Sequence, residues 1–286
     1  MSVLINHKGA VEVTHDQLNK LDDPIKNRLS DTHTPIHHGH FVTLVKNTAK
    51  AEGLEIIREE YSHRTGEPKR DPNGLPVTHG YDDMFGLLTV RSELSGVNHC
   101  IGLRGSNTMN FSRQLGAGNH VTVCDNLLFA AQVVIGRKHT SEILSDLPTL
   151  IVDALRKVTM SFDYDAVRTD VYKNRRVNDV TAHDVMMESI QRGSKEQRTP
   201  ASKLTDWLGE WHEPSHDEFK PRNAWSLLNA HTEVAKSWQH DVMAKRTEKV
   251  LGIMDEAFGV HKAALGRLSD RYTAEQIDEC QIAFAA

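Results

Sequence analysis

The sequence has no hydrophobic run long enough to cross a membrane. Its longest apolar stretches, such as residues 127–135, fall well short of the about 20 residues that a membrane-spanning helix needs. Residues 1–8 have no basic flank leading into a long apolar region, so we find no secretory signal. We therefore expect a protein without membrane contact that stays in the cytoplasm, or in the host cytoplasm if a phage encodes it.

Cysteine is scarce. Only Cys100, Cys124 and Cys280 are present, and none forms a C-x-x-C pair. An odd number of widely spaced cysteines argues against a disulfide scaffold and against a zinc site built from cysteine. We interpret the three residues as buried thiols.

An excess of positive charge is also missing. The formal net charge is −5 over 286 residues, so no global field attracts phosphate backbones. Any binding of nucleic acid has to come from a local patch. With 38% hydrophobic and 26% charged residues, the chain has a globular composition and is long enough to bury a core.

The first half of the chain predicts strands that follow an irregular start. Residues 1–40 are polar, and Pro35 and Gly39 interrupt the run 33–40, so we expect a lead-in arm. Residues 41–52 predict a short helix that ends at Gly53. We expect strands at 54–61, 84–91, 99–106, 109–115 and 120–124, and a loop at 62–78. Short consecutive strands with tight turns indicate an antiparallel sheet.

The second half predicts helices. Residues 127–135 suit a buried helix that stops at Gly136, and a second helix with a long apolar stripe begins at Ser141. In that helix, Pro148 either splits it or marks its true first turn. Further helical patterns cover 180–190, 201–211 and 224–259. The fold class is therefore α+β, with an antiparallel sheet packed with helices in the N-terminal half and a mostly helical C-terminal half. We divide the chain into a lead-in arm (1–40), an α+β core domain (41–160) and a helical region packed on the core (161–286).

Four histidines, His33, His37, His38 and His40, form the densest candidate for a metal site. No carboxylate accompanies them, and Pro35 and Gly39 prevent an uninterrupted helix that would fix their spacing. We interpret the run as a solvated segment and predict no metal site there.

Other catalytic patterns are weak. Cys124 with His139, or Ser106 with a distant histidine, could form a nucleophile and a base, but such pairs arise by chance in a chain with 17 histidines. The glycines at 102, 105, 116 and 118 match neither a Walker A loop nor a dinucleotide fingerprint. We predict no catalytic residue and no cofactor; we leave open whether the protein is an enzyme and favour one that is not.

Positive charge lies on the expected strands and near helix ends, where it suits phosphate oxygens. Phe111 offers a face for base stacking if it is exposed. The residues that we expect to line a groove for single-stranded nucleic acid are Arg104, Asn107, Arg113, Arg137, Lys138, Lys173, Arg175 and Arg176. The alternative is that the charges lie on solvated faces, that Asn107 and its neighbours occupy turns, and that Phe111 belongs to the core.

All four tryptophans, Trp207, Trp211, Trp225 and Trp238, fall in one helical region. Trp207 and Trp211 are four residues apart and share a helix face. We interpret them as core or helix–helix packing, with a subunit interface as the alternative.

Three segments in order carry a family resemblance: residues 102–107 (GLRGSN), 121–127 (VTVCDNL) and 137–140 (RKHT). They resemble the phage- and plasmid-encoded family whose shared region is called domain of unknown function 932. That family repeats a strand ending near Arg-Asn-Ser, then Val-Cys-x-Asn, then Arg-x-His-Thr. Residues 229–233 (NAHTE) resemble its Asn-Ala-x-Thr helix, so the likeness spans 35–238. Gly105 departs from the pattern, in which Asn is expected.

The resemblance implies a setting on mobile genetic elements. Our first hypothesis is a non-enzymatic protein that binds single-stranded DNA as a homo-oligomer, in annealing or recombination. A second is a protein-binding inhibitor or accessory factor acting against a host defence complex, which fits the acidic balance and the tryptophan-bearing helices. A third is a metal-dependent hydrolase that uses the run from His33 to His40.

Overall fold

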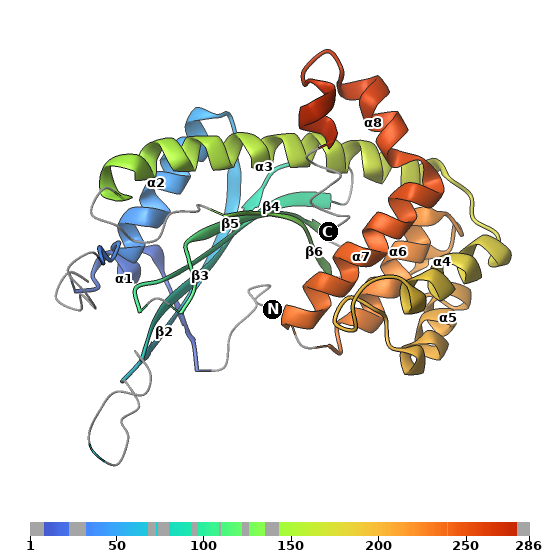
Figure 1. Cartoon of the computed structure of the whole chain (residues 1–286), viewed down its shortest axis with the longest axis horizontal. Helices are drawn as coiled ribbons and strands as arrows, with labels where there is room; N and C mark the ends of the chain where they lie inside the picture. Colours follow the sequence, from blue (N-terminus) through green and yellow to red (C-terminus); the bar gives the residue numbers. More distant parts are fainter. Residues whose placement is uncertain are drawn as a thin grey trace. The chain divides into compact units, whose positions relative to one another are not determined.

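The computed structural model describes residues 9–22, 33–67, 73, 80–92, 97–108, 110–121, 126–134, 143–238 and 240–278. The chain forms two compact units (Figure 1). The first comprises residues 1–93, 98–118 and 132–159, and the second comprises 94–97, 119–131 and 160–286. No helix in the described ranges is both long and apolar enough to cross a membrane.

Six strands form one sheet in the order of the sequence. They are β1 (Val11–Val13), β2 (Ile56–Gly66), β3 (Tyr81–Val90), β4 (Val97–Ser106), β5 (Gln114–Val121) and β6 (Asn126–Val134). The first four strands pair antiparallel, as expected for neighbours joined in sequence. The central strand β3 is buried over Asp83–Val90, so it anchors the sheet.

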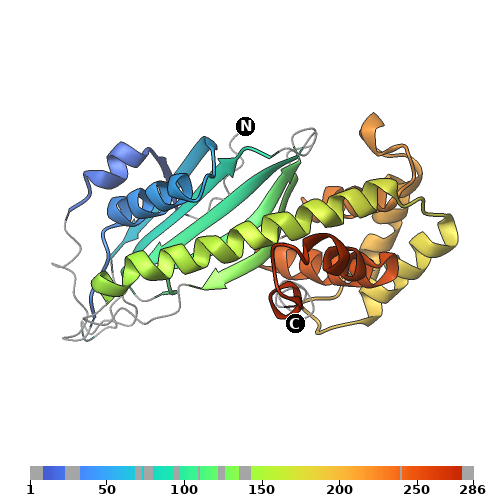
Figure 2. The same ribbon diagram turned by 90° about the horizontal axis from the view of Figure 1, so that it is seen from above.

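The register assigns side chains to the two faces of the sheet, because residues directly opposite each other share a face. His63 lies opposite Met84, which lies opposite Gly105, and Asp82 and Asn107 follow two residues further on the same face. Helix α2 (His38–Ala51) covers this face, since its first residue contacts His63. The first half of α3 (Ile143–Asn174) runs over the same face (Figure 2).

The predicted apolar stripe of α3 is confirmed for Ile143, Leu147, Ile151, Leu155 and Val158, which are all buried. The prediction that Leu144 belongs to this stripe is wrong, because its surface is 47% exposed. Pro148 lies inside the helix and does not end it.

One element was predicted with the wrong type of secondary structure. Residues 126–134 form the strand β6, where we expected a helix. A run of nine mostly apolar residues has no polar positions that would reveal its period, so it suits a buried strand as well as a buried helix. The described parts of the strands predicted at 109–115 and 120–124 contain the single strand β5, which begins at Gln114, and residues 109 and 122–124 lie outside the described residues.

Most of the second unit is helical, and it includes the C-terminal half of α3. Its helices are α4 (Asp179–Gln191), α5 (Leu204–His212), α6 (Ala224–Ala235), α7 (His240–Phe258) and α8 (Val260–Leu268), with short 3-10 turns at Ala201–Lys203 and Asp217–Phe219. A short helix α1 (His15–Asn19) belongs to the first unit. The α+β class is thus confirmed, with an antiparallel sheet in the N-terminal half and helices in most of the C-terminal half.

Two predictions concern which side chains are buried. Trp207 and Trp211 expose 1% and 2% of their surface, so the packing interpretation is confirmed for them. Cys100 is a free, fully buried thiol, as predicted. Cys124 and Cys280 lie outside the described residues.

Candidate functional site

The histidine run between residues 33 and 40 lies partly in the interior. His33 and His38 each expose only 2% of their surface, so the prediction of a solvated segment is wrong for both. Helix α2 begins within the run because the side chain of His37 caps it by accepting a hydrogen bond from the backbone N–H of His40 at 3.4 Å. Gly39 lets α1 approach, since a Cβ there would lie 2.8 Å from the Cα of Asn19.

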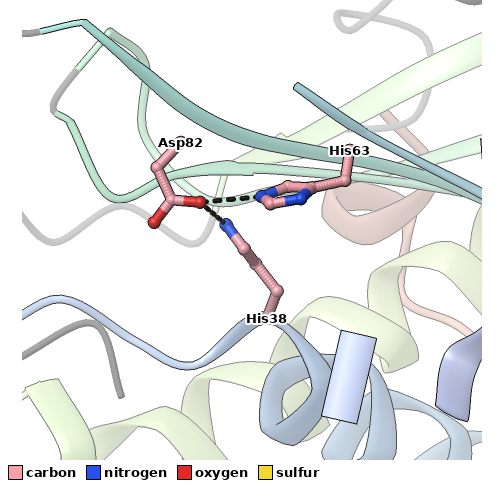
Figure 3. A group of neighbouring side chains, drawn as sticks. All are labelled: His38, His63 and Asp82. Carbon is pink, nitrogen blue, oxygen red and sulfur yellow. Dashed lines mark hydrogen bonds and ion pairs between the residues drawn. The ribbon is translucent and has the colours of Figure 1, made fainter. Parts of the chain in front are cut away.

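His38 meets His63 and Asp82, which come from β2 and β3 (Figure 3). The Nε2 atoms of His38 and His63 lie 3.0 and 2.8 Å from the same carboxylate oxygen, Oδ1 of Asp82. The two imidazole rings meet edge to face with centroids 5.4 Å apart. Two imidazoles therefore converge on one carboxylate oxygen. We call these three residues the His-Asp cluster.

Asn107 and Arg113 form a second layer around the cluster. The Asn107 amide donates to Oδ2 of Asp82 at 3.0 Å, and its oxygen accepts from the backbone N–H of Ile36 and from Nη2 of Arg113, each at 3.0 Å. Arg113 also donates to the carbonyl oxygen of Ile36, and its guanidinium lies 3.4 Å from Nδ1 of His38. The side-chain amide of Asn107 is thus fixed in one orientation, with its N–H groups toward the cluster.

Burial sets the charges of this region. It lowers the pKa of His38 from 6.5 to about 4, against the opposing effect of the Asp82 hydrogen bond, so His38 is neutral at pH 7. Burial tends to raise the pKa of Asp82, but hydrogen bonds from His38, His63 and Asn107 outweigh it and hold that pKa well below its usual range. Burial lowers the pKa of Arg113 to about 9, and the Asp82 carboxylate opposes this shift. At pH 7 the region therefore contains a carboxylate, a guanidinium and a neutral His38.

Gly105 explains how Arg113 reaches the cluster. A Cβ at position 105 would lie 2.5 Å from Nη1 of Arg113 and 3.1 Å from its Cγ. The absence of a side chain at position 105 thus leaves room for the close approach of the arginine side chain.

We predict that Gly105→Ala lowers the free energy of unfolding by about 1–3 kcal/mol, because the added methyl group displaces a buried arginine. Urea unfolding followed by circular dichroism measures the change. Gly209→Ala in α5 is the matched control, since a Cβ at that position meets nothing within 4 Å and alanine favours a helix. Equal stabilities of the Gly105→Ala variant and the unchanged protein would contradict the prediction.

The opposite face of the sheet carries arginines beside aromatic rings. Arg104 on β4 is half-buried, with its guanidinium carbon 5.4 Å from the ring centre of Phe111 and its Nε 2.5 Å from Oε1 of Gln114. No carboxylate bonds to Arg104 in the described part of the chain, and burial lowers its pKa. The Phe111 ring is itself half-buried and lies 5.6 Å from the ring of Phe85. Among the described residues, Arg104 therefore has no acidic partner and lies next to a partly exposed aromatic ring.

A second arginine–aromatic pair lies on the same face. The guanidinium carbon of Arg64 on β2 lies 3.9 Å from the ring centre of Tyr81, whose surface is 39% exposed. Arg64 also donates to Oδ2 of the buried Asp83 carboxylate, through Nη2 at 2.5 Å and through Nε at 3.1 Å. Asp83 lies opposite both Arg64 and Ser106, so the register places Arg64 and Ser106 in one row across three strands. Because Arg104 is two residues from Ser106, it belongs to the same face.

The eight residues predicted for a nucleic-acid groove fall into four groups. Asn107 and Arg113 are buried beside the His-Asp cluster, so the prediction that they line an open groove is wrong in this structure. Arg104 remains partly exposed on the opposite face of the sheet. Arg175 and Arg176 are exposed in the second unit, where Lys173 lies 5.5 Å from the ring centre of Trp225. Arg137 and Lys138 lie outside the described residues.

His63, Asp82, Arg64 and Tyr81 were not predicted as functional residues. The available signal was the alternation of β2, in which Tyr61 and His63 share a face while Arg64 points to the other. That alternation gives no register against β3, which follows after a long polar segment. The pairing of His63 with Asp82 therefore needs the folded sheet.

Comparison with known proteins identifies no relative. No family model, no curated protein and no solved structure matches the chain. The resemblance to domain of unknown function 932 therefore stays a prediction, and functional conclusions rest on the geometry of the two faces of the sheet.

Proposed function

We propose that the protein binds single-stranded nucleic acid on the sheet face that carries Arg104 and Phe111. The observation that supports this is the half-buried guanidinium of Arg104, which has no carboxylate partner among the described residues and lies beside a partly exposed ring. A cation held away from water without an acidic partner attracts a phosphate oxygen strongly. A partly exposed ring offers a surface on which any base can stack.

Arg64 and Tyr81 extend the proposed surface across the sheet. Asp83 neutralises the charge of Arg64, so this pair contributes stacking area and hydrogen-bond donors more than net charge. Arg64 and Arg104 lie on β2 and β4, two strands apart and two residues out of line, which corresponds to roughly 12 Å at the usual strand dimensions. A single-stranded nucleic acid that crosses this sheet face would therefore contact two arginine–aromatic pairs in succession.

The negative net charge of the chain is compatible with this proposal only if binding is local. Few phosphates are then contacted, so affinity is expected to be moderate and to fall with salt. Annealing of complementary strands by a homo-oligomer, in recombination on a mobile genetic element, is the form of the activity that we favour. The exposed pair Arg175 and Arg176 is a second candidate contact, in the other unit.

The proposal is tested by fluorescence anisotropy with a labelled single-stranded oligothymidylate. We expect the double variant Arg104→Gln, Phe111→Leu to raise the Kd at least about 10-fold, since one stacked base alone contributes about 1–3 kcal/mol. The slope of log K against log salt should become shallower by about 0.7 when one phosphate contact is removed.

The control is Arg192→Gln in α4, whose arginine is exposed but already paired with Glu188 and Glu256. This variant should bind as the unchanged protein does. The double variant Arg175→Ala, Arg176→Ala measures the contribution of the second unit. Absent or salt-independent binding by the unchanged protein would contradict the proposal, and so would a normal Kd in the Arg104 and Phe111 variant.

A further inference from the structure

The His-Asp cluster has the donor set of a transition-metal site. The side-chain atoms available as ligands are Nε2 of His38, Nε2 of His63 and Oδ1 of Asp82, and they all lie within 4.8 Å of one another. Two imidazole nitrogens and one carboxylate oxygen are the three-ligand set of many mononuclear zinc and iron(II) centres. The cluster lies on the face opposite Arg104, so it is independent of the proposed nucleic-acid surface.

The distances suit an ion between the three atoms. Protein ligands lie about 2.1 Å from zinc, which places two ligand atoms of a tetrahedral site about 3.4 Å apart. The nitrogen–oxygen distances are 3.0 Å for His38 and 2.8 Å for His63. Each imidazole nitrogen therefore needs to move away from Oδ1 by a few tenths of an ångström, and the two nitrogens, which lie within 4.8 Å of each other, have to reach the same separation of about 3.4 Å. Each imidazole would exchange its N–H bond to Oδ1 for a bond from Nε2 to the metal, with its ring proton moving from Nε2 to Nδ1.

The surroundings hold the ligands in place. The amide of Asn107 bonds to Oδ2 of Asp82 and leaves Oδ1 for a single metal bond. Second-layer hydrogen bonds of this kind orient ligand carboxylates in metal sites. The Asp82 side chain is 20% exposed while the His38 side chain is 1% exposed, so an ion can enter from the carboxylate side. A site with three protein ligands keeps a fourth position for water.

Arg113 limits the affinity. Its guanidinium lies 3.4 Å from Nδ1 of His38 and attracts the same carboxylate that the ion would bind. The ion and the guanidinium are both positive and repel each other, and a metal-bound His38 would carry its ring proton on Nδ1, the atom that faces the N–H groups of Arg113. We therefore expect a Kd on the order of micromolar, weaker than that of structural zinc sites.

We propose that His38, His63 and Asp82 bind one divalent transition-metal ion of the zinc class. The histidine that comes from the 33–40 run thus acts with partners on two strands and not with its neighbours in sequence. His37 is engaged with the carbonyl oxygen of Leu21 at 3.0 Å, which leaves it outside the site.

The test is isothermal titration calorimetry with zinc ion on protein purified without a histidine tag. We expect one ion per chain for the unchanged protein and at least about 10-fold weaker binding for His63→Gln and for His38→Gln. His40→Gln is the matched control, because His40 is exposed in the same histidine run and should leave binding unchanged.

A second measurement does not depend on variants that fold poorly. X-ray absorption of the zinc-loaded, unchanged protein should give a first shell of nitrogen and oxygen that includes two imidazoles. No stoichiometric ion, a first shell without imidazole, or equal affinities in the His63→Gln and unchanged proteins would overturn the proposal. None of these measurements involves nucleic acid, so the outcome is separate from that of the proposed function.

Discussion

Replacing Arg168 by Met should lower the free energy of unfolding of the helical unit by about 3–5 kcal/mol, the largest single effect that we expect. Arg168 is 4% exposed and donates to Asp255 through Nε at 2.9 Å and Nη2 at 2.8 Å, and to Asp165 through Nη1. Tyr172 donates to the same Asp255 carboxylate at 2.6 Å. Without the guanidinium, two buried carboxylates lose their countercharge, which is the costly way to break a buried ion pair.

The control for this prediction is Arg267→Met. Arg267 pairs with Asp170 on the same helix α3, but both side chains are about half exposed, so the loss should stay below about 1 kcal/mol. Urea unfolding of both variants followed by tryptophan fluorescence gives the comparison. Similar small losses in the free energy of unfolding of the two variants would show that the buried network contributes little to stability.

The helical unit should also lose stability in acid because of His231. Burial lowers the pKa of His231 from 6.5 to about 3, and neither ring nitrogen has a hydrogen-bond partner in the described structure. Its ring lies between those of Trp207 and Trp238, at centroid distances of 4.8 and 5.4 Å. As the pH falls from 6.5 toward 3, the unfolded chain takes up a proton at this residue while the folded chain does not. This residue alone therefore removes about 1.4 kcal/mol of stability per pH unit across that window.

His231→Phe isolates this contribution. The variant keeps an aromatic ring between the two tryptophans and removes two unpartnered polar atoms, so we expect a gain of about 1–2 kcal/mol at pH 7. At pH 4.5 its advantage over the unchanged protein should grow by about 2–3 kcal/mol, since the proton-linked loss is absent. His38 titrates in the same direction in both proteins, so the difference between them reports His231. An advantage that does not change with pH would contradict the assignment.

Local patterns were sufficient for much of the fold. The apolar stripe of α3 repeats at helical spacing over several turns, so its helix could be recognised without tertiary information. The residues of β6 lack such a repeat, and the pairing of the sheet decides their conformation. The predicted single helical stretch 224–259 is divided into α6 and α7 near Lys236–Trp238, where no proline or glycine marks a break.

The candidate sites depended on register, which the sequence does not specify. Both Arg104 and Arg113 were predicted to lie on strands. Arg104 is half-buried on the face opposite the His-Asp cluster, whereas Arg113 is buried beside that cluster. A shift of one residue exchanges the faces of a strand, and only the ladder between β3 and β4 fixes that choice. His38 was recognised as a possible ligand, but its partners His63 and Asp82 lie 25 and 44 residues away along the chain.

The central claim is that single-stranded nucleic acid lies on the sheet face of Arg104 and Phe111. The most direct measurement is photo-crosslinking to an oligonucleotide that carries 4-thiothymidine, followed by mass spectrometry of the crosslinked peptides. We expect crosslinks at Phe111 and Tyr81, whose rings are partly exposed beside arginines. Crosslinks confined to the Arg175–Arg176 segment, or no crosslink at a protein concentration that saturates the anisotropy signal, would contradict the claim.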